Sequence, residues 1–105
     1  MTDKVLVLTT VGNESEAKKI AHGLVERRLA ACVNIVPRIQ SVYRWEGKLE
    51  SSEECLLLIK TSQSRLADVQ TAIRELHSYE VPEFVAISIE AGSKEYLNWL
   101  TESID

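Results

Sequence analysis

The chain has 105 residues, of which 45% are apolar and 27% charged, and its formal net charge is −4. These values are typical of an ordinary globular protein, and we expect residues 1–105 to form a single domain with one modest core. Basic residues are scattered along an acidic chain, and the apolar run at residues 5–8 is far too short to span a membrane. We therefore expect no nucleic-acid partner and no membrane partner.

The first two elements are predicted to be a strand and a helix. Residues 4–11 form a short apolar strand that ends at Gly12. Asn13 and Glu16 make a helix-capping pair. After this pair, apolar residues recur at helical spacing: Ala17, Ile20, Ala21, Leu24, Val25 and Leu29. This pattern predicts a helix that continues to about residue 29, and Gly23 within it is expected to mark a close packing contact.

The middle of the chain is predicted to be an oversized β-hairpin. Residues 32–45 and 49–61 are rich in β-branched and aromatic side chains and flank a tight corner at residues 46–48. Fourteen strand residues reach about 46 Å, whereas a compact domain of this length is about 33 Å across. The hairpin should therefore overhang its own domain and carry Tyr43 and Trp45 with it. Because an exposed two-stranded ribbon is only marginally stable, we predict a homo-oligomer built through this hairpin.

Two cysteines, Cys32 and Cys55, lie on opposite arms of the predicted hairpin. If Trp45 faces Glu50, the cysteines are about 26 Å apart along the ribbon, and a bulge at Pro37 would shift this by about one residue. This separation excludes an intrachain disulfide and a metal site shared by both thiols within one chain. Free, mostly buried thiols suit a reducing compartment, so we expect a cytoplasmic protein.

The last third of the chain is predicted to contain a helix, a strand and a short terminal helix. Ser62 is expected to cap the first of these helices, which should end near His77. Pro82 disfavours helix at Val81, and residues 84–89 form a fourth strand, followed by a helix at residues 93–103. The fold class is therefore α+β: a ferredoxin-like sandwich with an antiparallel sheet. Both main helices would cover one face, and the open second face is another argument for oligomerisation.

Five ordered blocks of sequence carry a family resemblance. They are residues 29–35 (LAACVNI), 43–50 (YRWEGKLE), 58–61 (LIKT), 79–83 (YEVPE) and 96–99 (YLNW). Together they resemble the CutA divalent-cation-tolerance proteins along nearly the whole chain. The resemblance implies a cytoplasmic homotrimer built by hairpin exchange, and a link to copper(II) and other divalent cations. Because that trimer resembles the PII nitrogen-signalling proteins, it also implies clefts between subunits.

The resemblance also suggests candidate metal ligands. Copper binding in the family is associated with a first-strand cysteine and a pair of adjacent histidines; here Thr9 or its neighbour and a single histidine, His77, take their places. His77, Glu80 and Glu83 are the candidate ligands. One imidazole cannot hold copper(II) tightly, although a neighbouring subunit could multiply it. The favoured alternative is that His77 is a solvated helix-end residue, and His22 is expected to face solvent.

Two further groups of side chains have competing interpretations. The acidic residues Glu46, Glu50, Glu53 and Glu54 either attract hard cations weakly or form a solvated edge that discourages aggregation, and the second is favoured. A second group combines aromatic walls with a few charges: Tyr43, Trp45, Glu50, Lys60, Tyr79 and Glu83. This group is either a small-ligand cleft between subunits, as the resemblance implies, or a set of aromatic interface anchors.

These patterns predict a binding protein rather than an enzyme. The sequence has no glycine-rich phosphate loop, zinc signature or defensible catalytic constellation. Our leading hypothesis is a non-catalytic homotrimer that binds a divalent cation, copper in particular, and contributes to metal tolerance. The alternative is a PII-like signalling trimer whose cleft binds a small molecule and whose loops contact an unknown protein partner.

Overall fold

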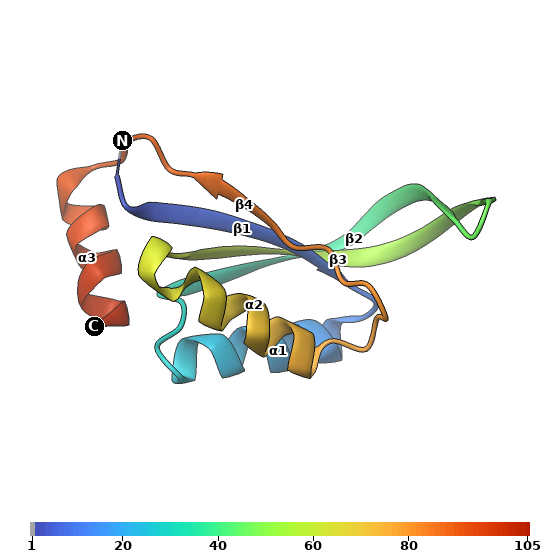
Figure 1. Cartoon of the computed structure of the whole chain (residues 1–105), viewed down its shortest axis with the longest axis horizontal. Coiled ribbons are helices and arrows are strands. Elements are labelled where there is room, and N and C mark those ends of the chain that lie inside the picture. The colour runs from blue at the N-terminus through green and yellow to red at the C-terminus, as the bar shows by residue number, and fades with distance from the viewer. Residues whose placement is uncertain (1) are drawn as a thin grey trace.

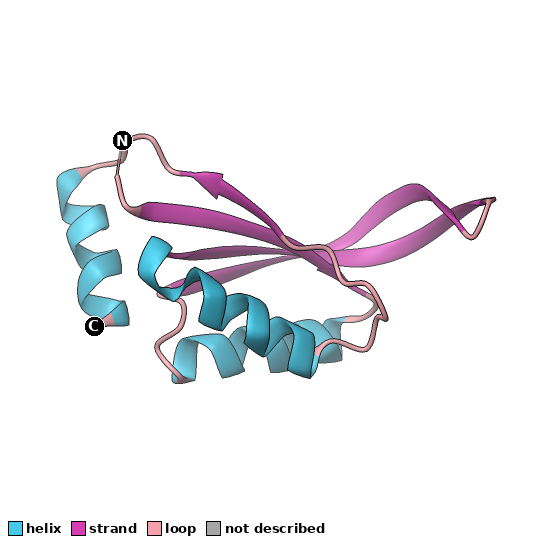
Figure 2. Ribbon diagram, viewed as in Figure 1, coloured by secondary structure: helices cyan, strands magenta, loops and turns pink. Residues whose placement is uncertain are grey.

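Four strands form one antiparallel sheet in the order β2-β3-β1-β4 in the computed structural model, which describes residues 2–105. The elements follow the order β1 (Lys4–Val11), α1 (Glu14–Glu26), β2 (Cys32–Trp45), β3 (Lys48–Ser62), a short 3-10 turn (Gln63–Arg65), α2 (Leu66–Leu76), β4 (Val85–Ser88) and α3 (Lys94–Ile104). Helices α1 and α2 lie on one side of the sheet, and α3 stands at the end where the chain termini lie (Figures 1 and 2). The predicted ferredoxin-like α+β fold is confirmed.

The core lies between the sheet and the pair α1 and α2. Strand β1 alternates, so that Val5, Val7 and Val11 are buried while Leu6 and Leu8 are only half-buried. The buried face of β3 and the inner faces of both helices complete the core: Leu57, Ile59, Ala17, Ile20, Leu24, Val69, Ala72 and Ile73. A smaller cluster joins α3 to the loop before β2 through Ala31, Leu97, Leu100 and Ile104.

Helix α1 begins as predicted but ends earlier. The Asn13 side chain accepts a hydrogen bond from the Glu16 backbone N–H at 2.8 Å, which confirms the predicted cap. The helix ends at Glu26 rather than near residue 29, because Arg28 adopts a left-handed conformation (φ 58°). Leu29 nevertheless packs against the core from the loop, which explains why the helical spacing of apolar residues extends beyond the helix itself.

Gly23 faces α2, and a Cβ atom there would lie 3.4 Å from Leu76 Cδ1, an ordinary van der Waals distance. The helices therefore approach closely, although nothing in that gap requires glycine. The predicted Ser62 cap was wrong: its side chain makes no capping bond, because Ser62 is still paired with Lys4 in the sheet and its hydroxyl accepts a hydrogen bond from Lys4 Nζ.

One buried hydroxyl group in the core lacks a hydrogen-bond partner within the described chain, and its removal should change the stability of the protein measurably. Thr9 is completely buried, and its hydroxyl has no hydrogen-bond partner among residues 2–105. We expect Thr9→Val to raise the free energy of unfolding by about 1 kcal/mol in urea denaturation, because valine keeps the shape and removes the unsatisfied group. Thr61 is equally buried, but its hydroxyl donates to the Leu29 carbonyl at 2.6 Å. Thr61→Val should therefore lower stability, and equal shifts in both variants would contradict this account.

The hairpin of β2 and β3 projects far beyond the body of the molecule (Figure 1). The molecule measures 44 Å along its long axis but only 25 and 23 Å across, so the predicted overhang is confirmed. A two-residue turn closes the hairpin, with positive φ at both Glu46 (50°) and Gly47 (79°). The predicted register was wrong by two residues: Trp45 faces Lys48, and Tyr43 faces Glu50. The reason is that the turn is shorter than the loop assumed from the sequence.

A β-bulge interrupts the hairpin next to Pro37, the position at which a bulge was considered from the sequence. The ladder passes from Val36 opposite Leu56 to Ile39 opposite Glu54, so two residues of β2 face one of β3. Cys32 pairs opposite Lys60, five positions from Cys55, and both cysteines are free. Cys55 is buried and Cys32 half-buried, and the predicted absence of a disulfide between them follows from this separation.

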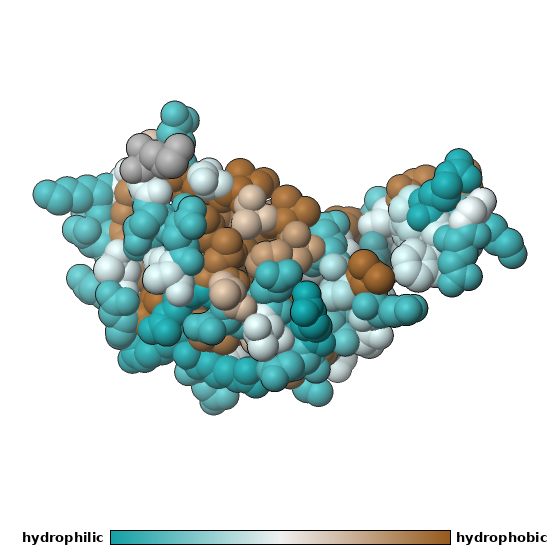
Figure 3. All heavy atoms as spheres, viewed as in Figure 1, coloured by the Kyte–Doolittle hydropathy of each residue, from teal (hydrophilic) through white to brown (hydrophobic). Residues whose placement is uncertain are grey.

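Among residues 2–105, the part of the second sheet face that β1 and β4 form is left partly open to solvent. Leu6 and Leu8 of β1 lie beside Ile87 and Val85 of β4, which are 46% and 45% exposed. Apolar atoms gather along this side of the molecule in Figure 3. The predicted open second face is therefore present at β1 and β4 in the single chain, because the long helices α1 and α2 both pack on the other face. A soluble protein rarely leaves such a face open to water.

Candidate functional site

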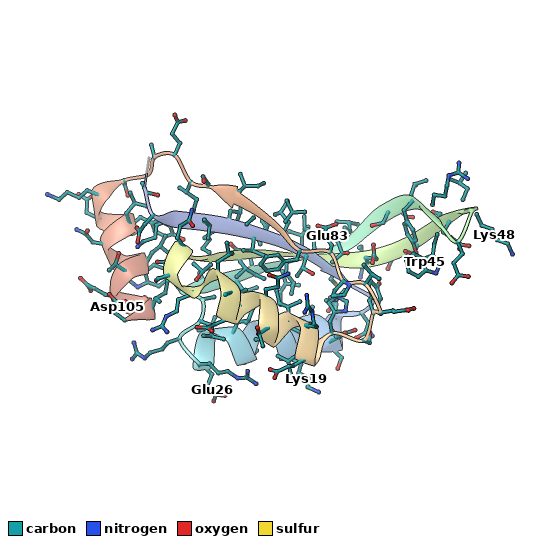
Figure 4. All side chains as sticks on the ribbon, in the orientation of Figure 1. Lys19, Glu26, Trp45, Lys48, Glu83 and Asp105 are labelled. Carbon is teal, nitrogen blue, oxygen red and sulfur yellow. The ribbon has the colours of Figure 1, made fainter. Side chains whose placement is uncertain are left out.

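A groove of about 800 Å³ lies on the side of the sheet opposite the helices, where the hairpin leaves the body of the molecule. Three parts of the chain line it: the hairpin, the end of β1 at Thr10, and the segment 79–83 between α2 and β4. Its functional side chains are three aromatic rings and four carboxylates: Tyr43, Trp45, Tyr79, Glu50, Glu54, Glu80 and Glu83. In Figure 4, Glu83 lies at the base of the hairpin and Trp45 farther out toward the tip.

The bulge decides which way the hairpin aromatics point. Before the bulge, the odd-numbered Val33 and Ile35 pair with Ile59 and Leu57 on the helix-covered face. The extra residue reverses the alternation, because side chains of successive strand residues point to opposite faces. Beyond it, the odd-numbered residues of β2 share the opposite face with even-numbered residues of β3, as in the pair Tyr43 and Glu50. The bulge therefore brings the aromatic residues of β2 to the groove.

His77 is a buried structural residue that fixes the segment beside the groove. Its side chain is fully buried, Nε2 lies 2.6 Å from the Thr10 carbonyl oxygen, and Nδ1 accepts a hydrogen bond from the Tyr79 N–H at 3.1 Å. Because Nδ1 is the acceptor, Nε2 must carry the proton and donate to Thr10. The favoured interpretation of His77 as a solvated residue was wrong, because the end of α2 packs over β1. His22 is exposed, as predicted.

Glu16 ties the same segment to α1. Its carboxylate accepts hydrogen bonds from the Ser78 N–H at 2.7 Å and from the Ser78 hydroxyl at 3.0 Å. The sequence indicated Glu16 only as part of a helix cap, and a contact across 62 positions leaves no local pattern that would reveal it. Together, His77 and Glu16 hold the wall that carries Tyr79 and Glu83 against the sheet.

Glu54 is a buried carboxylate at the floor of the groove. It is only 7% exposed, and its Oε2 accepts a hydrogen bond from the Tyr79 hydroxyl at 2.6 Å. Its assignment to a solvated edge was therefore wrong. Burial and this hydrogen bond raise the pKa of Tyr79 above its ordinary value of 10.0. Glu83 is exposed, but partial desolvation of its carboxylate and the nearby Glu54 carboxylate raise its pKa as well.

Four glutamates line the groove, and no basic side chain lies among its lining residues. Neither Glu54 nor Glu83 takes part in any ion pair among residues 2–105, and no lysine, arginine or histidine lines the groove. Lys60, the basic residue of the predicted cleft, lies elsewhere on β3: its Nζ donates to the Tyr96 hydroxyl at 3.2 Å and lies 5.5 Å from that ring's centroid. The single chain therefore brings together five of the six predicted cleft residues and leaves Lys60 apart.

Two of the three predicted metal ligands line the groove, and the third does not. Glu80 and Glu83 both line the groove, whereas both ring nitrogens of His77 are already engaged in hydrogen bonds. Within residues 2–105, no three side chains of histidine, cysteine, aspartate or glutamate converge as a tight metal centre requires. Copper(II) favours imidazole and other nitrogen ligands. The donors of a single chain therefore do not fit copper(II), while the carboxylate oxygens suit a weakly held hard cation.

The charge on Glu83 should appear in the pH dependence of stability. Its pKa lies above the ordinary value of 4.5, so the folded state holds this proton more tightly than the unfolded state. Stability should then fall as pH rises from 4.5 through the raised pKa. Melting temperatures between about pH 4 and pH 8 test this. We expect the Glu83→Gln variant to lose less stability as pH rises and to have a higher melting temperature than the native protein at neutral pH. Glu26 is exposed on α1, so the Glu26→Gln variant should follow the native pH profile.

Comparison with known proteins assigns the chain to a family. Residues 5–103 match the family model described as CutA1 divalent ion tolerance protein. The chain belongs to the CutA1 family. It is 49% identical over 98 residues to the divalent-cation tolerance protein CutA of Thermus thermophilus, a match that spans 93% of this chain and 95% of the relative. The resemblance noted from the five sequence blocks is thereby confirmed.

Solved structures and longer relatives extend the comparison. The crystal structure of CutA from Xylella fastidiosa superposes with a TM-score of 0.97 at 39% identity, covering 99% of this chain and 100% of that chain. The chloroplastic protein CutA of Arabidopsis thaliana is 50% identical over 94% of this chain, which spans only 54% of that relative. The family name concerns tolerance of divalent cations and describes no catalysed reaction. Among residues 2–105, none of the helices has the length and apolar character that a membrane crossing needs.

Proposed function

We propose that this CutA1 protein is a non-catalytic homotrimer that holds divalent cations weakly through carboxylate oxygens at the base of its hairpin. The observation that carries the proposal is the groove itself, which gathers four carboxylates and no basic side chain. A hydrated divalent cation relieves the repulsion between Glu54 and Glu83 without needing a closed ligand cage. Carboxylate and water ligands suit hard cations such as Mn²⁺ and Mg²⁺, and among residues 2–105 the groove lacks the imidazole and thiolate donors of tight copper(II) sites.

Two features of the single chain support the assembly. The face with Leu6, Leu8, Val85 and Ile87 is apolar and uncovered, and burial of such a face against other copies is favourable at about 25 cal/mol per Å². The outer hairpin, whose Leu49 is 73% exposed near the tip, projects beyond the other elements that residues 2–105 form. A trimer that buries both features explains them together. The two free cysteines suit a reducing compartment, so the proposal places the protein in the cytoplasm.

Assembly and metal binding can be tested on the same samples. Sedimentation equilibrium at micromolar concentration should give three times the chain mass. Electron paramagnetic resonance of free Mn²⁺ should show loss of signal with a dissociation constant of about 10⁻⁴ to 10⁻³ M, as expected for an open carboxylate site. Glu83→Gln should weaken this binding, while Glu26→Gln on α1 should not. A monomer in solution, or equal Mn²⁺ binding by all three proteins, would refute the corresponding half of the proposal.

A second candidate function is a small-ligand cleft of the PII-like signalling kind. The specific observation is the aromatic wall, since Tyr43, Trp45 and Tyr79 line a volume within the range of ordinary ligand pockets. Aromatic rings of this kind would not strengthen the binding of a hydrated metal ion. Trp45→Ala distinguishes the cleft from an interface anchor: an intact trimer that no longer binds ligand supports the cleft, and loss of the trimer supports the anchor. Signalling of this kind also requires a protein partner, and we propose such a partner only for this second candidate function.

A further inference from the structure

We propose that the groove at the base of the hairpin binds a small organic cation, one that carries ammonium groups on an aliphatic chain. The proposal rests on the second candidate function, a small-ligand cleft, and names the chemical class of its ligand. Three observations lead to it: an uncompensated buried carboxylate, aromatic rings held in place around it, and a volume too large for a metal ion alone.

The buried carboxylate of Glu54 requires a positively charged partner. Glu54 is more than nine-tenths buried and lines the groove, and within the described residues 2–105 its carboxylate accepts one hydrogen bond, from the neutral hydroxyl of Tyr79. A buried carboxylate is costly unless a cation accompanies it. No such cation comes from residues 2–105, because none of their ion pairs involves Glu54. Glu50, Glu80 and Glu83 on the same walls add further negative charge, so the compensating group must come from outside the chain.

The aromatic rings distinguish an organic cation from a metal ion. In the single chain, Tyr43 and Trp45 are 43% and 44% exposed beside the groove. The Tyr43 hydroxyl lies 3.2 Å from Ser52 Oγ, and Tyr79 is fixed by Glu54, so two of the three rings are held before any ligand arrives. An ammonium group over a ring face gains cation–π energy, and its methylene groups gain apolar contact. A divalent ion inside its water shell gains neither.

The volume of the groove supports the same choice. Six waters around a metal ion fill about 180 Å³ at about 30 Å³ each, whereas the groove holds about 800 Å³. Carboxylates line the groove from β3 and from the segment 79–83. An elongated polyamine places one ammonium group at the buried Glu54 and others at the remaining carboxylates, with its hydrocarbon chain against the rings.

The two tryptophans allow a direct test, because Trp45 lines the groove and Trp99 lies on α3. In Trp99→Phe, the fluorescence comes from Trp45 alone. Titration with spermidine at constant ionic strength should then give a saturable change, which the uncharged triethylene glycol should not produce. Glu54→Gln and Glu83→Gln in this background should each weaken binding about fivefold to tenfold, and Glu26→Gln should leave it unchanged. In Trp45→Phe, the remaining Trp99 signal should not respond.

Three outcomes would overturn the proposal. Displacement of spermidine by Mg²⁺ at concentrations as low as those at which spermidine itself binds would show that the groove does not distinguish an organic cation from a metal ion. Loss of affinity in Glu26→Gln as large as in Glu83→Gln would show non-specific attraction to an acidic protein. Absence of spermidine binding until the assembly is dissociated would show that another copy of the chain fills the groove. Sedimentation and Mn²⁺ binding of the same samples report on the trimer and metal proposals separately, so their failure is distinguishable from failure of this one.

Discussion

Replacement of His77 by alanine is expected to lower the free energy of unfolding by about 2–4 kcal/mol. The imidazole is fully buried and joins the Thr10 carbonyl to the Tyr79 N–H. Alanine would leave both backbone groups without their partner and open a cavity under the segment 79–83. Urea denaturation followed by circular dichroism measures the loss, and the groove wall that carries Tyr79 should loosen with it.

His22→Ala is the matched control, because His22 is the other histidine of the chain and is exposed on α1. It should change stability by no more than about 0.5 kcal/mol. Similar small losses in both variants would show that the buried contacts of His77 do not hold the segment in place. The prediction also bears on metal titrations: reduced cation uptake by His77→Ala would report a displaced groove wall rather than a lost ligand, so the fold of that variant has to be measured alongside.

Leu8→Asp is expected to convert the proposed trimer into a monomer that keeps its fold. Leu8 is half-buried on the open face, opposite Leu58 of β3 and Val85 of β4. A carboxylate there still reaches solvent in the single chain but would be buried without a partner in an assembly, at a cost of several kcal/mol. Sedimentation velocity detects the change in mass, and circular dichroism verifies the fold.

Val25→Asp provides the comparison for this second prediction. Val25 is an exposed apolar residue on α1, 42% exposed and on the helix side of the molecule rather than on the open sheet face. The substitution adds the same charge and should leave the trimer intact. Dissociation by both variants would indicate a general effect of charge, and a trimeric Leu8→Asp protein would place the interface elsewhere.

Several elements were predictable because their determinants are local. The Asn13 cap of α1 depends on an amide oxygen and an N–H three residues apart, and the sequence places both together. The hairpin arms were predictable from their β-branched and aromatic content, and their overhang from length alone. Where the local signal was incomplete, boundaries moved: Leu29 follows the helical spacing yet packs from a loop, and the hairpin turn proved two residues tighter than assumed.

The site residues also differ in whether the sequence alone could predict them. Aromatic and acidic residue types pointed to Tyr43, Trp45, Glu50, Tyr79 and Glu83, and the groove contains all five. The burial of His77 and Glu54 was not predictable, because it depends on packing between elements far apart in the chain. Glu54 illustrates the difficulty, since it lies in an acidic stretch that resembles a solvated edge, yet it is buried and accepts a hydrogen bond from Tyr79, which is 25 positions away.

By itself, therefore, the sequence determined the order of elements, the ferredoxin-like topology, the long hairpin and the family, because periodicity, turn chemistry and block motifs act over a few neighbouring residues. The tertiary structure alone decided which side chains meet. One extra residue at the bulge brings the aromatic residues of β2 to the groove side. A histidine and a glutamate fix a distant segment opposite them. Such contacts depend on the summed geometry of the whole fold, for which no short stretch of sequence carries a signal.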